Sequence, residues 1–427
     1  MSNKITQLAC ATANGVMDWV NARAPGMMPA YRKHMTEYYA PKNFNIWYIF
    51  GVLSLVVLVN QIVTGIFLTM HFKPSAAEAF DSVEYIMRDV DWGWLIRYLH
   101  STGASMFFIV IYLHMFRGMM YGSYKKPREL VWLLGMVIYL VLMAEAFMGY
   151  VLPWGQMSYW GAKVIISLFG AIPVVGTGLT EWIMGDFNPG DATLNRFFAL
   201  HVVALPLVLL LLVVLHIFAL HEVGSNNPDG VEIKKGPKGN RWSPTAPADG
   251  IPFHPYYTVK DLFYVACFLG ISAFVIFFAP TFDGWFLEHD NFTAANQLVT
   301  PAHIKPVWYF TPYYAMLRVI PSFFGIKLWG VLVMFGAIVC LFLVPWLDKS
   351  PVKSYRYRGW LSWTMLAIFV VSFCWLAKIG AGPGTDPVEA IIGRVLTFLY
   401  FAFFITMPVW TKIDKTKPVP ERVTTHD

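Results

Sequence analysis

Two histidines lie inside one long apolar segment of this chain, where ionisable side chains are rare. His100 and His114 belong to RYLHSTGASMFFIVIYLHMFR, which covers residues 97–117. On a helix, an interval of 14 residues returns the second imidazole to within about 40° of the face of the first and separates the two by ~21 Å along the axis. One helix face is therefore predicted to carry two metal-binding side chains at two depths.

A second apolar segment carries two more histidines. FFALHVVALPLVLLLLVVLHIFAL covers residues 197–220 and contains His201 and His216, which are 15 residues apart. The extra residue turns the second imidazole about 60° past the face of the first. Since Pro206 lacks the N–H that a regular hydrogen-bond ladder needs, we predict a kink or a π-type bulge between His201 and about Leu210.

Glycines repeat at a similar spacing in two further apolar segments. Each pair is 14 residues apart, and the four are Gly51, Gly65, Gly135 and Gly149. A glycine lets a flat macrocycle lie against the helix backbone, and histidines that converge from two helices supply both axial ligands of an iron porphyrin. We therefore predict two b haems, each held by two histidines, stacked across a membrane.

The four histidines could instead be structural, or they could bind zinc. A single histidine in an apolar helix is more often a hydrogen-bonded interior residue, but four at matched depths favour function. Zinc is disfavoured because imidazoles about 21 Å apart on one helix cannot share an ion, and no carboxylate or cysteine lies beside them at ligand spacing. The four cysteines are dispersed and form no CxxCH motif, so the haems would be held non-covalently.

The composition indicates an all-α, polytopic membrane protein. Of 427 residues, 57% are hydrophobic, 17% aromatic and only 14% charged, which is too apolar for a soluble chain. The net charge of +6 predicts no nucleic-acid partner, because the basic residues lie in loops and tails. Eight transmembrane helices are predicted at residues 46–70, 93–116, 130–151, 197–220, 262–281, 325–347, 359–377 and 392–411.

Lysine and arginine gather in alternate connections, which predicts that these connections and both termini are cytoplasmic. Two long intervening connections, 152–196 and 282–324, would fold over the periplasmic side. Residues 230–250 have too many polar and turn-forming residues to pack, and we expect an exposed loop there. The expected parts are a cytoplasmic N-terminal segment (1–43), a four-helix di-haem bundle (44–222), a cytoplasmic loop (223–261), a second four-helix membrane domain (262–411) and a cytoplasmic tail (412–427).

This polarity orders the haems. The predicted pairs are His100 with His201 near the periplasm and His114 with His216 near the cytoplasm. Arg97 and Arg117 lie three residues outside His100 and His114, close enough to bind haem propionates at each interface. The same spacing suits arginines at helix ends whose long side chains reach the polar membrane surface. Both roles stay open for the two arginines.

Four motifs lie in the connections between these helices. In chain order they are GYVLPWGQMSYWGA (149–162), LHEVGSNNP (220–228), IPFHPYYTVKD (251–261) and PVWYFTPYYAMLR (306–318). Together they resemble the cytochrome b family, the membrane core of the ubiquinol:cytochrome c oxidoreductase of respiratory complex III, from about Asn43 to the eighth helix. The resemblance implies a quinol-oxidising pocket on the periplasmic side and a quinone-reducing pocket on the cytoplasmic side. It also implies a low-potential haem at His100 and His201 and a high-potential haem at His114 and His216.

The resemblance also implies which residues line the two pockets. The first would have aromatic walls that suit a flat isoprenoid quinone, formed by residues 158–170 with Phe147, Tyr150, Pro306, Val307, Trp308 and Tyr309. The second would use the polar residues His221, Ser225, Lys260 and Asp261. A histidine and an aspartate beside a quinone can deliver the two protons that its reduction consumes. The alternative for His221 is a helix C-terminal residue that the macrodipole favours.

By the same resemblance, the chain would work with separate subunits in the bacterial inner membrane. The family implies a Rieske iron–sulfur subunit, a membrane-anchored c-type cytochrome, ubiquinol as substrate, proton translocation and a homodimer of the complex. Two rivals remain: the split plastoquinol-oxidising relative, and a di-haem membrane anchor of a quinone-linked dehydrogenase. The fused chain of eight predicted helices argues against the first, and the PVWY and GYVLPWGQ motifs argue against the second.

One departure from the family concerns the proton of quinol. The family turn usually reads PEWY, and its glutamate is thought to accept that proton, but here the position is Val307, which cannot ionise. Glu145 is the one carboxylate well inside an apolar segment, four residues before Gly149 and near Phe147 and Tyr150. Because a buried carboxylate is costly, we hypothesise that Glu145 replaces the motif glutamate. The alternative is a structural glutamate that is hydrogen-bonded to a neighbouring helix.

Overall fold

The computed structural model of the chain describes residues 2–322 and 328–424. Within these residues, eight helical spans are long and apolar enough to cross a membrane, as predicted. They are α3 (Phe50–Thr69) with the short turn before it, α5 (Gly93–Tyr121), α6 (Glu129–Val151), α9 (Asp191–Ala199) continued by η4 (Leu200–Ala204) and α10 (Leu205–Val223), α11 (Thr258–Phe278), α13 (Leu328–Leu347), α14 (Trp360–Ala381) and α15 (Pro387–Ile405).

Two predicted boundaries need comment. Residues 325–327 of the sixth predicted helix lie outside the described residues. The eighth was expected to continue to residue 411, but α15 ends at Ile405 and a separate helix, α16 (Met407–Ile413), follows. That expectation was wrong because Pro408 has no N–H to donate to the preceding turn, so the ladder of α15 cannot run through it.

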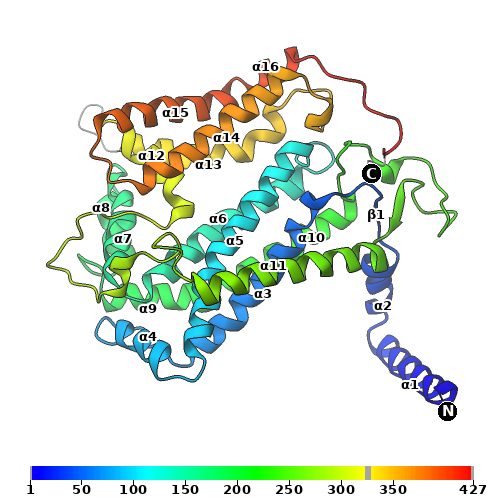
Figure 1. Ribbon diagram of the computed structural model, residues 1–427, viewed down its shortest axis with the longest axis horizontal. Helices are drawn as coiled ribbons and strands as arrows, with labels where there is room; N and C mark the ends of the chain where they lie inside the picture. Colours follow the sequence, from blue (N-terminus) through cyan, green and yellow to red (C-terminus); the bar gives the residue numbers. More distant parts are fainter. Residues whose placement is uncertain (1, 323–327, 425–427) are drawn as a thin grey trace.

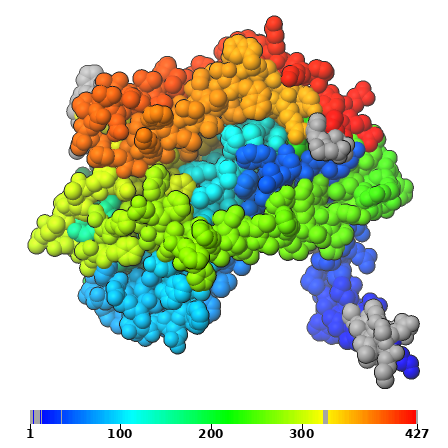
Figure 2. All heavy atoms as spheres, viewed as in Figure 1, coloured from blue at the N-terminus to red at the C-terminus, as the bar shows by residue number. Residues whose placement is uncertain are grey.

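The connections divide between the two ends of the helices (Figure 1). Both termini and a two-stranded antiparallel sheet, β1 (Tyr39–Pro41) with β2 (Gly250–Pro252), lie at one end, which we call the terminal end. The other end, the loop end, carries α4 (Ala79–Arg88), α7 (Gln156–Ser167) and α8 (Gly176–Met184). The N-terminal helices, α1 (Ser2–Arg23) and α2 (Met27–Tyr31), extend away from the other helices (Figure 1), and the coloured part of this segment lies outside the packed body in Figure 2.

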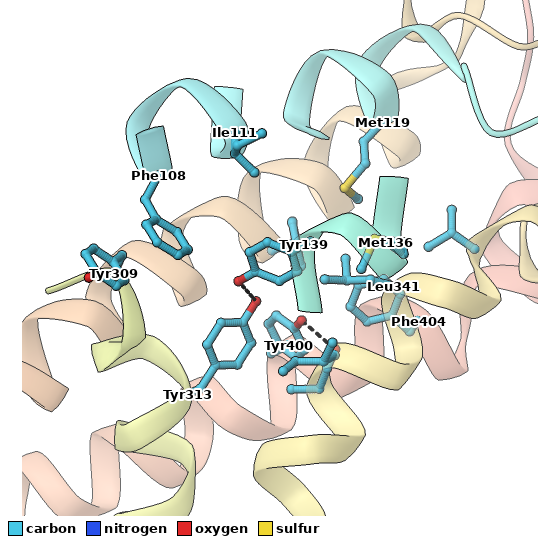
Figure 3. Packing of buried hydrophobic residues seen from close by; sticks show 14 of the residues in the cluster. Phe108, Ile111, Met119, Met136, Tyr139, Tyr309, Tyr313, Leu341, Tyr400 and Phe404 are labelled. Atoms are coloured by element: carbon cyan, nitrogen blue, oxygen red, sulfur yellow. Dashed lines mark hydrogen bonds between the residues drawn. The ribbon is translucent and has the colours of Figure 1, made fainter. Parts of the chain in front are cut away.

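An apolar core joins the first helices to the last ones (Figure 3). Phe108 of α5 stacks on Tyr309, with ring centroids 3.8 Å apart and planes at 4°. The hydroxyl of Tyr139 in α6 donates to that of Tyr313 in α12 (Thr311–Val319) at 3.1 Å. The hydrogen bond pairs two hydroxyl groups that would be costly to leave without a partner in an apolar interior. The turn that carries Tyr309 is thereby fixed against α5 and α6.

The predicted irregularity in the second histidine helix is confirmed. Between α9 and α10 the chain forms a π-helical turn, η4, which contains His201 and ends just before Leu205 and Pro206. A π turn has one more residue in each hydrogen-bonded loop than an α turn, so it can absorb the single extra residue between His201 and His216. The helix continues without a break on either side of it.

The segment at residues 230–250 was expected to be an exposed loop, and this is wrong in part. It is irregular, but Ile233, Ala246 and Asp249 are buried. Asp249 forms ion pairs with Lys42 at 3.0 Å and with Arg422 at 2.7 Å. The segment packs because charges from both chain termini neutralise this buried acid, a long-range pairing that local composition does not encode.

A second buried acid links two connections at the terminal end. Asp348 lies 2.5 Å from Arg358, with both side chains fully buried, and 3.2 Å from Lys125. The hydroxyl of Tyr124 donates to the same carboxylate at 2.6 Å. These contacts connect the turn after α5 with the turn after α13.

We predict that Asp348→Asn destabilises the protein. Removing one partner of a buried ion pair leaves the other charge uncompensated and typically costs about 3–5 kcal/mol. Thermal unfolding of the purified protein in detergent should show a clearly lower midpoint. Asp283→Asn is the control, because the Asp283 side chain is exposed and asparagine tolerates its positive φ of 50°. Equal midpoints for the two variants would contradict this account.

Candidate haem and quinone sites

The four histidines meet in two pairs between α5 and the helix from Asp191 to Val223. The ring centroids of His100 and His201 are 6.1 Å apart with planes at 89°, and those of His114 and His216 are 6.4 Å apart at 63°. A metal held at about 2 Å from one nitrogen of each ring sets two centroids roughly 6 Å apart. Both separations fit one iron between two imidazoles.

The four glycines lie opposite the four histidines, one to one. A Cβ atom on Gly51, Gly65 and Gly135 would lie 3.6, 3.2 and 3.3 Å from the Cε1 atoms of His114, His100 and His216, respectively. At Gly149 it would overlap the ring of His201. A larger side chain at any of these positions would compete with an imidazole for space. That a flat macrocycle also lies against these glycines stays a prediction.

Hydrogen bonds at Nδ1 orient the two histidines nearer the loop end. His100 Nδ1 lies 2.9 Å from Thr64 Oγ1, and His201 Nδ1 lies 2.9 Å from the backbone oxygen of Glu145. Partners at Nδ1 leave Nε2 for the metal, which is the usual arrangement of histidine ligands. The chain therefore holds these rings in an orientation that suits axial ligation of a haem.

Glu145 faces the histidine column, not the predicted quinol pocket. Its Oε1 lies 3.0 Å from His201 Nδ1, and its Oε2 is buried without a hydrogen-bond partner among the described residues. The expected position beside the pocket is therefore wrong. The helix geometry that puts Glu145 on the side of Gly149 turns it about 140° away from Tyr150, five residues later. The alternative, contact with a neighbouring helix, is what the structure has, and we do not propose Glu145 as the proton acceptor.

The two arginines lie at the ends of the histidine column. Arg117 has one Nη atom 3.5 Å from His114 Nδ1, and its guanidinium lies 4.8 Å from the ring centre of Tyr48. Its Nε is buried with no partner in the described part of the chain, which suits a carboxylate ligand such as a haem propionate. Arg97 is partly buried and interacts electrostatically with Tyr150.

The turn at residues 306–309 packs against α5. Trp308 Nε1 donates to Ser105 Oγ at 3.1 Å, while Tyr309 stacks on Phe108 (Figure 3). Burial raises the pKa of Tyr309 far above its ordinary value, so its hydroxyl stays protonated at neutral pH. The turn therefore presents aromatic rings and a neutral hydroxyl.

The structure separates two residues that were expected to share one wall. Tyr150 packs against the cluster that contains Tyr309, whereas Phe147 packs in a different cluster, with its ring 5.6 Å from that of Phe197. Ser158 Oγ of α7 donates to the backbone oxygen of Tyr150 at 2.6 Å. The wall near Tyr309 therefore includes Tyr150 and the start of α7, but not Phe147.

Glu288 is the residue here that sequence reasoning missed. It lies in the connection between α11 and the 306–309 turn, is 4% exposed, and its carboxylate accepts a hydrogen bond from the Tyr150 hydroxyl. Burial raises the pKa of this carboxyl to about 7, although the Tyr150 hydrogen bond lowers it. A search for carboxylates within apolar segments does not find Glu288, because the composition of its connection predicts a surface loop.

At the terminal end, His221 and Ser225 meet around one tyrosine. The ring of Tyr38 stacks on His221 with centroids 4.3 Å apart, and its hydroxyl lies 3.1 Å from Ser225 Oγ. His34 Nδ1 lies 2.9 Å from His221 Nδ1. The N-terminal segment thus adds two side chains to this site, and neither His34 nor Tyr38 stood out in the sequence.

Lys260 and Asp261 lie near the start of α11. A row of aromatic rings separates them from His221. The ring of Tyr38 lies 6.1 Å from that of Phe253, which lies 6.0 Å from that of Tyr257. Lys260 Nζ donates to the backbone oxygen of Phe44 at 3.2 Å. Lys260 Nζ lies 6.0 Å from the ring centre of Tyr257, and Asp261 interacts electrostatically with the same tyrosine. His221 and Ser225 therefore border the aromatic cluster at Tyr38, and Lys260 and Asp261 border it at Tyr257.

Comparisons with known proteins agree over almost the whole chain. The family profile described as Cytochrome b/b6/petB matches residues 35–224, and the one described as Cytochrome b(C-terminal)/b6/petD matches residues 294–401. The cytochrome b of Allochromatium vinosum is 63% identical over 408 residues, which cover 96% of this chain and 98% of the relative. The cytochrome b of Rhodospirillum rubrum is 48% identical over 407 residues, which cover 95% of each chain.

A solved structure is similar as well. A chain of a hyperthermophilic respiratory Complex III aligns with a TM-score of 0.83 at 41% identity, and the alignment covers 93% of this chain and 98% of that one. Both family profiles fall on a single polypeptide here, so the chain is fused and not split. On the sequence, the fold and the paired histidines, this chain belongs to the cytochrome b family.

Proposed function

We propose that this chain is the cytochrome b subunit of a quinol:cytochrome c oxidoreductase in a bacterial inner membrane, with both termini cytoplasmic. The observation that carries the proposal is the meeting of four histidines in two pairs at two depths, each histidine opposed by a glycine. The similarity to a chain of respiratory Complex III supports it. On this topology the loop end is periplasmic and the terminal end cytoplasmic.

The histidine pairs would hold two b haems. His100 and His201 would bind the low-potential haem near the loop end, and His114 and His216 the high-potential haem near the terminal end. When bound, the haems supply one-electron transfer between the two sides of the membrane. The protein orients the imidazoles of His100 and His201 through their Nδ1 partners and surrounds both pairs with apolar helices.

Ubiquinol would be oxidised at the loop end. Tyr309 and Trp308 form an aromatic surface that is fixed against α5, and the partly buried Tyr150 supplies a hydroxyl beside it. Flat aromatic walls with a few polar groups suit a quinol ring. Here the chain binds and orients the substrate, and its polar groups take up the protons that oxidation releases.

Quinone would be reduced at the terminal end. His221 and Asp261 border the aromatic cluster there and can each deliver one of the two protons that reduction of a quinone consumes. Ser225 and Lys260 would orient the ring through hydrogen bonds. Proton release at one end and uptake at the other would couple electron transfer to proton translocation.

The remaining redox centres would belong to other subunits. The sequence has no CxxCH motif, and its four cysteines are too dispersed to ligate an iron–sulfur cluster. A Rieske iron–sulfur protein and a membrane-anchored c-type cytochrome are therefore the proposed partners, within a dimer of the complex.

The function is tested on the complex purified through a tag on this chain. We expect a reduced-minus-oxidised spectrum with two b-haem bands, one of them sensitive to antimycin, together with quinol-dependent reduction of cytochrome c. A Rieske protein and a c-type cytochrome should co-purify. Two b haems without cytochrome c reduction, in a complex with a dehydrogenase, would instead identify a di-haem membrane anchor.

We predict that Gly149→Leu removes the low-potential haem band and leaves the other. The side chain would occupy the space of the His201 ring, and such overpacking costs about 1–3 kcal/mol or more. The matched control is Gly270→Leu in α11, where a Cβ atom meets nothing within 4 Å. Difference spectra of the two variants provide the measurement, and retention of both bands in Gly149→Leu would rule out close glycine packing.

A further inference from the structure

Glu288 is a buried acid in a connection that runs along the loop end (Figure 1). Its hydrogen-bond partner is Tyr150, whose hydroxyl donates to its carboxylate. Burial raises the pKa of Glu288 to about 7 and the charge of Asp290 adds to this effect, while the bond from Tyr150 and the charge of Lys305 oppose it. A carboxyl group that titrates near neutral pH can take up and release a proton during turnover.

Glu288 lies among the segments that form the proposed quinol-binding wall. Two residues before it, the ring of Phe286 lies 6.4 Å from that of Trp308 in the 306–309 turn. Three residues after it, Asn291 Oδ1 accepts a hydrogen bond from the backbone N–H of Ser158 at 2.9 Å. The connection is therefore held between the turn and the start of α7.

The 306–309 turn has no carboxylate of its own. Val307 is buried and cannot ionise. The groups that face Glu288 are Tyr150 from α6, Tyr309 from the turn, Lys305 just before the turn and the exposed Asp290. Arg97 of α5 interacts electrostatically with Tyr150. Glu288 is the one buried carboxylate in this set.

We propose that Glu288 accepts, through the hydroxyl of Tyr150, one of the protons that quinol loses when it is oxidised at the loop end. The inference rests on the proposed function. Oxidation of one quinol to quinone releases two electrons and two protons. The proposed iron–sulfur partner would take up one electron and one proton, and the haem that His100 and His201 would hold would take up the second electron. The second proton passes to Tyr150 as the tyrosine gives its own proton to Glu288, so the tyrosine is unchanged.

Release of that proton needs a path to water. Glu288 itself is buried, but the next two residues, His289 and Asp290, are exposed at the loop end. A proton on the Glu288 carboxyl therefore has exposed titratable groups as its immediate neighbours in the chain. In this proposal the proton-accepting carboxylate lies outside the 306–309 turn, in the connection that precedes it.

The test is Glu288→Gln in the intact complex. At pH 7 we expect quinol oxidation to slow by about a hundredfold, at the low end of what loss of a positioned base costs. Both b-haem spectra and reduction of the haems through the quinone site at the terminal end should be unchanged. In the wild type, the rate should rise with pH through about 7, because only the ionised carboxylate accepts a proton, and this rise should vanish in the variant.

Further variants separate proton transfer from a structural role. Glu181→Gln, the matched control, removes an exposed acid of α8 at the loop end and should keep the rate and the rise with pH. Val307→Glu in the Glu288→Gln background should restore part of the rate. A redox-difference infrared spectrum of the wild type should contain a carboxylic-acid C=O band that is lost in Glu288→Gln. If Glu288→Gln does not assemble, Tyr150→Phe should slow quinol oxidation similarly while both haems stay bound.

The outcomes are distinguishable. A wild-type complex that does not oxidise quinol would overturn the proposed function itself. A wild-type complex that does so, with a Glu288→Gln variant of equal rate and equal pH profile, would overturn only the role of Glu288. A variant that is slower by the same factor at every pH, with the infrared band retained, would reduce Glu288 to a structural contact and also overturn the proposal.

Discussion

Imidazoles from two different helices must pair at two separate depths of an apolar interior. That requirement governs most of the structure. On α5 the spacing of 14 residues meets it with regular α-helix, but the partner helix has 15 residues between His201 and His216 and needs the π turn at residues 200–204. The flanking helices α3 and α6 contribute by having glycine where any side chain would compete with an imidazole for space.

The polar groups of the connections follow a second constraint, the high cost of a buried charge. Each buried acid at the terminal end has basic partners from distant parts of the chain. Asp348 meets Arg358 and Lys125, and Asp229 meets Arg356. Such pairs stabilise a fold little more than apolar residues of similar volume would. They favour one arrangement of the turns, because any other arrangement would leave a buried charge without a partner. They therefore set how the turns of the first four helices sit against those of the last ones.

The two ends of the molecule use aromatic rings in different ways. At the loop end, the stack of Tyr309 on Phe108 fixes the 306–309 turn, so the residues near it hold defined positions. At the terminal end, Tyr38 places a ring from the N-terminal segment over His221. A large ring buries much apolar surface at a small entropy cost, so single stacks can anchor long irregular segments.

Hydropathy and helix period act within one segment, and what they control was predictable from the sequence. The eight spans, the shared face of His100 and His114, the glycines opposite them and the irregularity near His201 all follow from counting along single helices. The tertiary structure alone decided which distant segments meet. It turned Glu145 towards His201, brought His34 and Tyr38 to His221, buried Asp249 against both termini and set Glu288 against Tyr150. Contacts of this kind depend on how connections pack over the helix ends, where no repeating period marks which side chain faces inward.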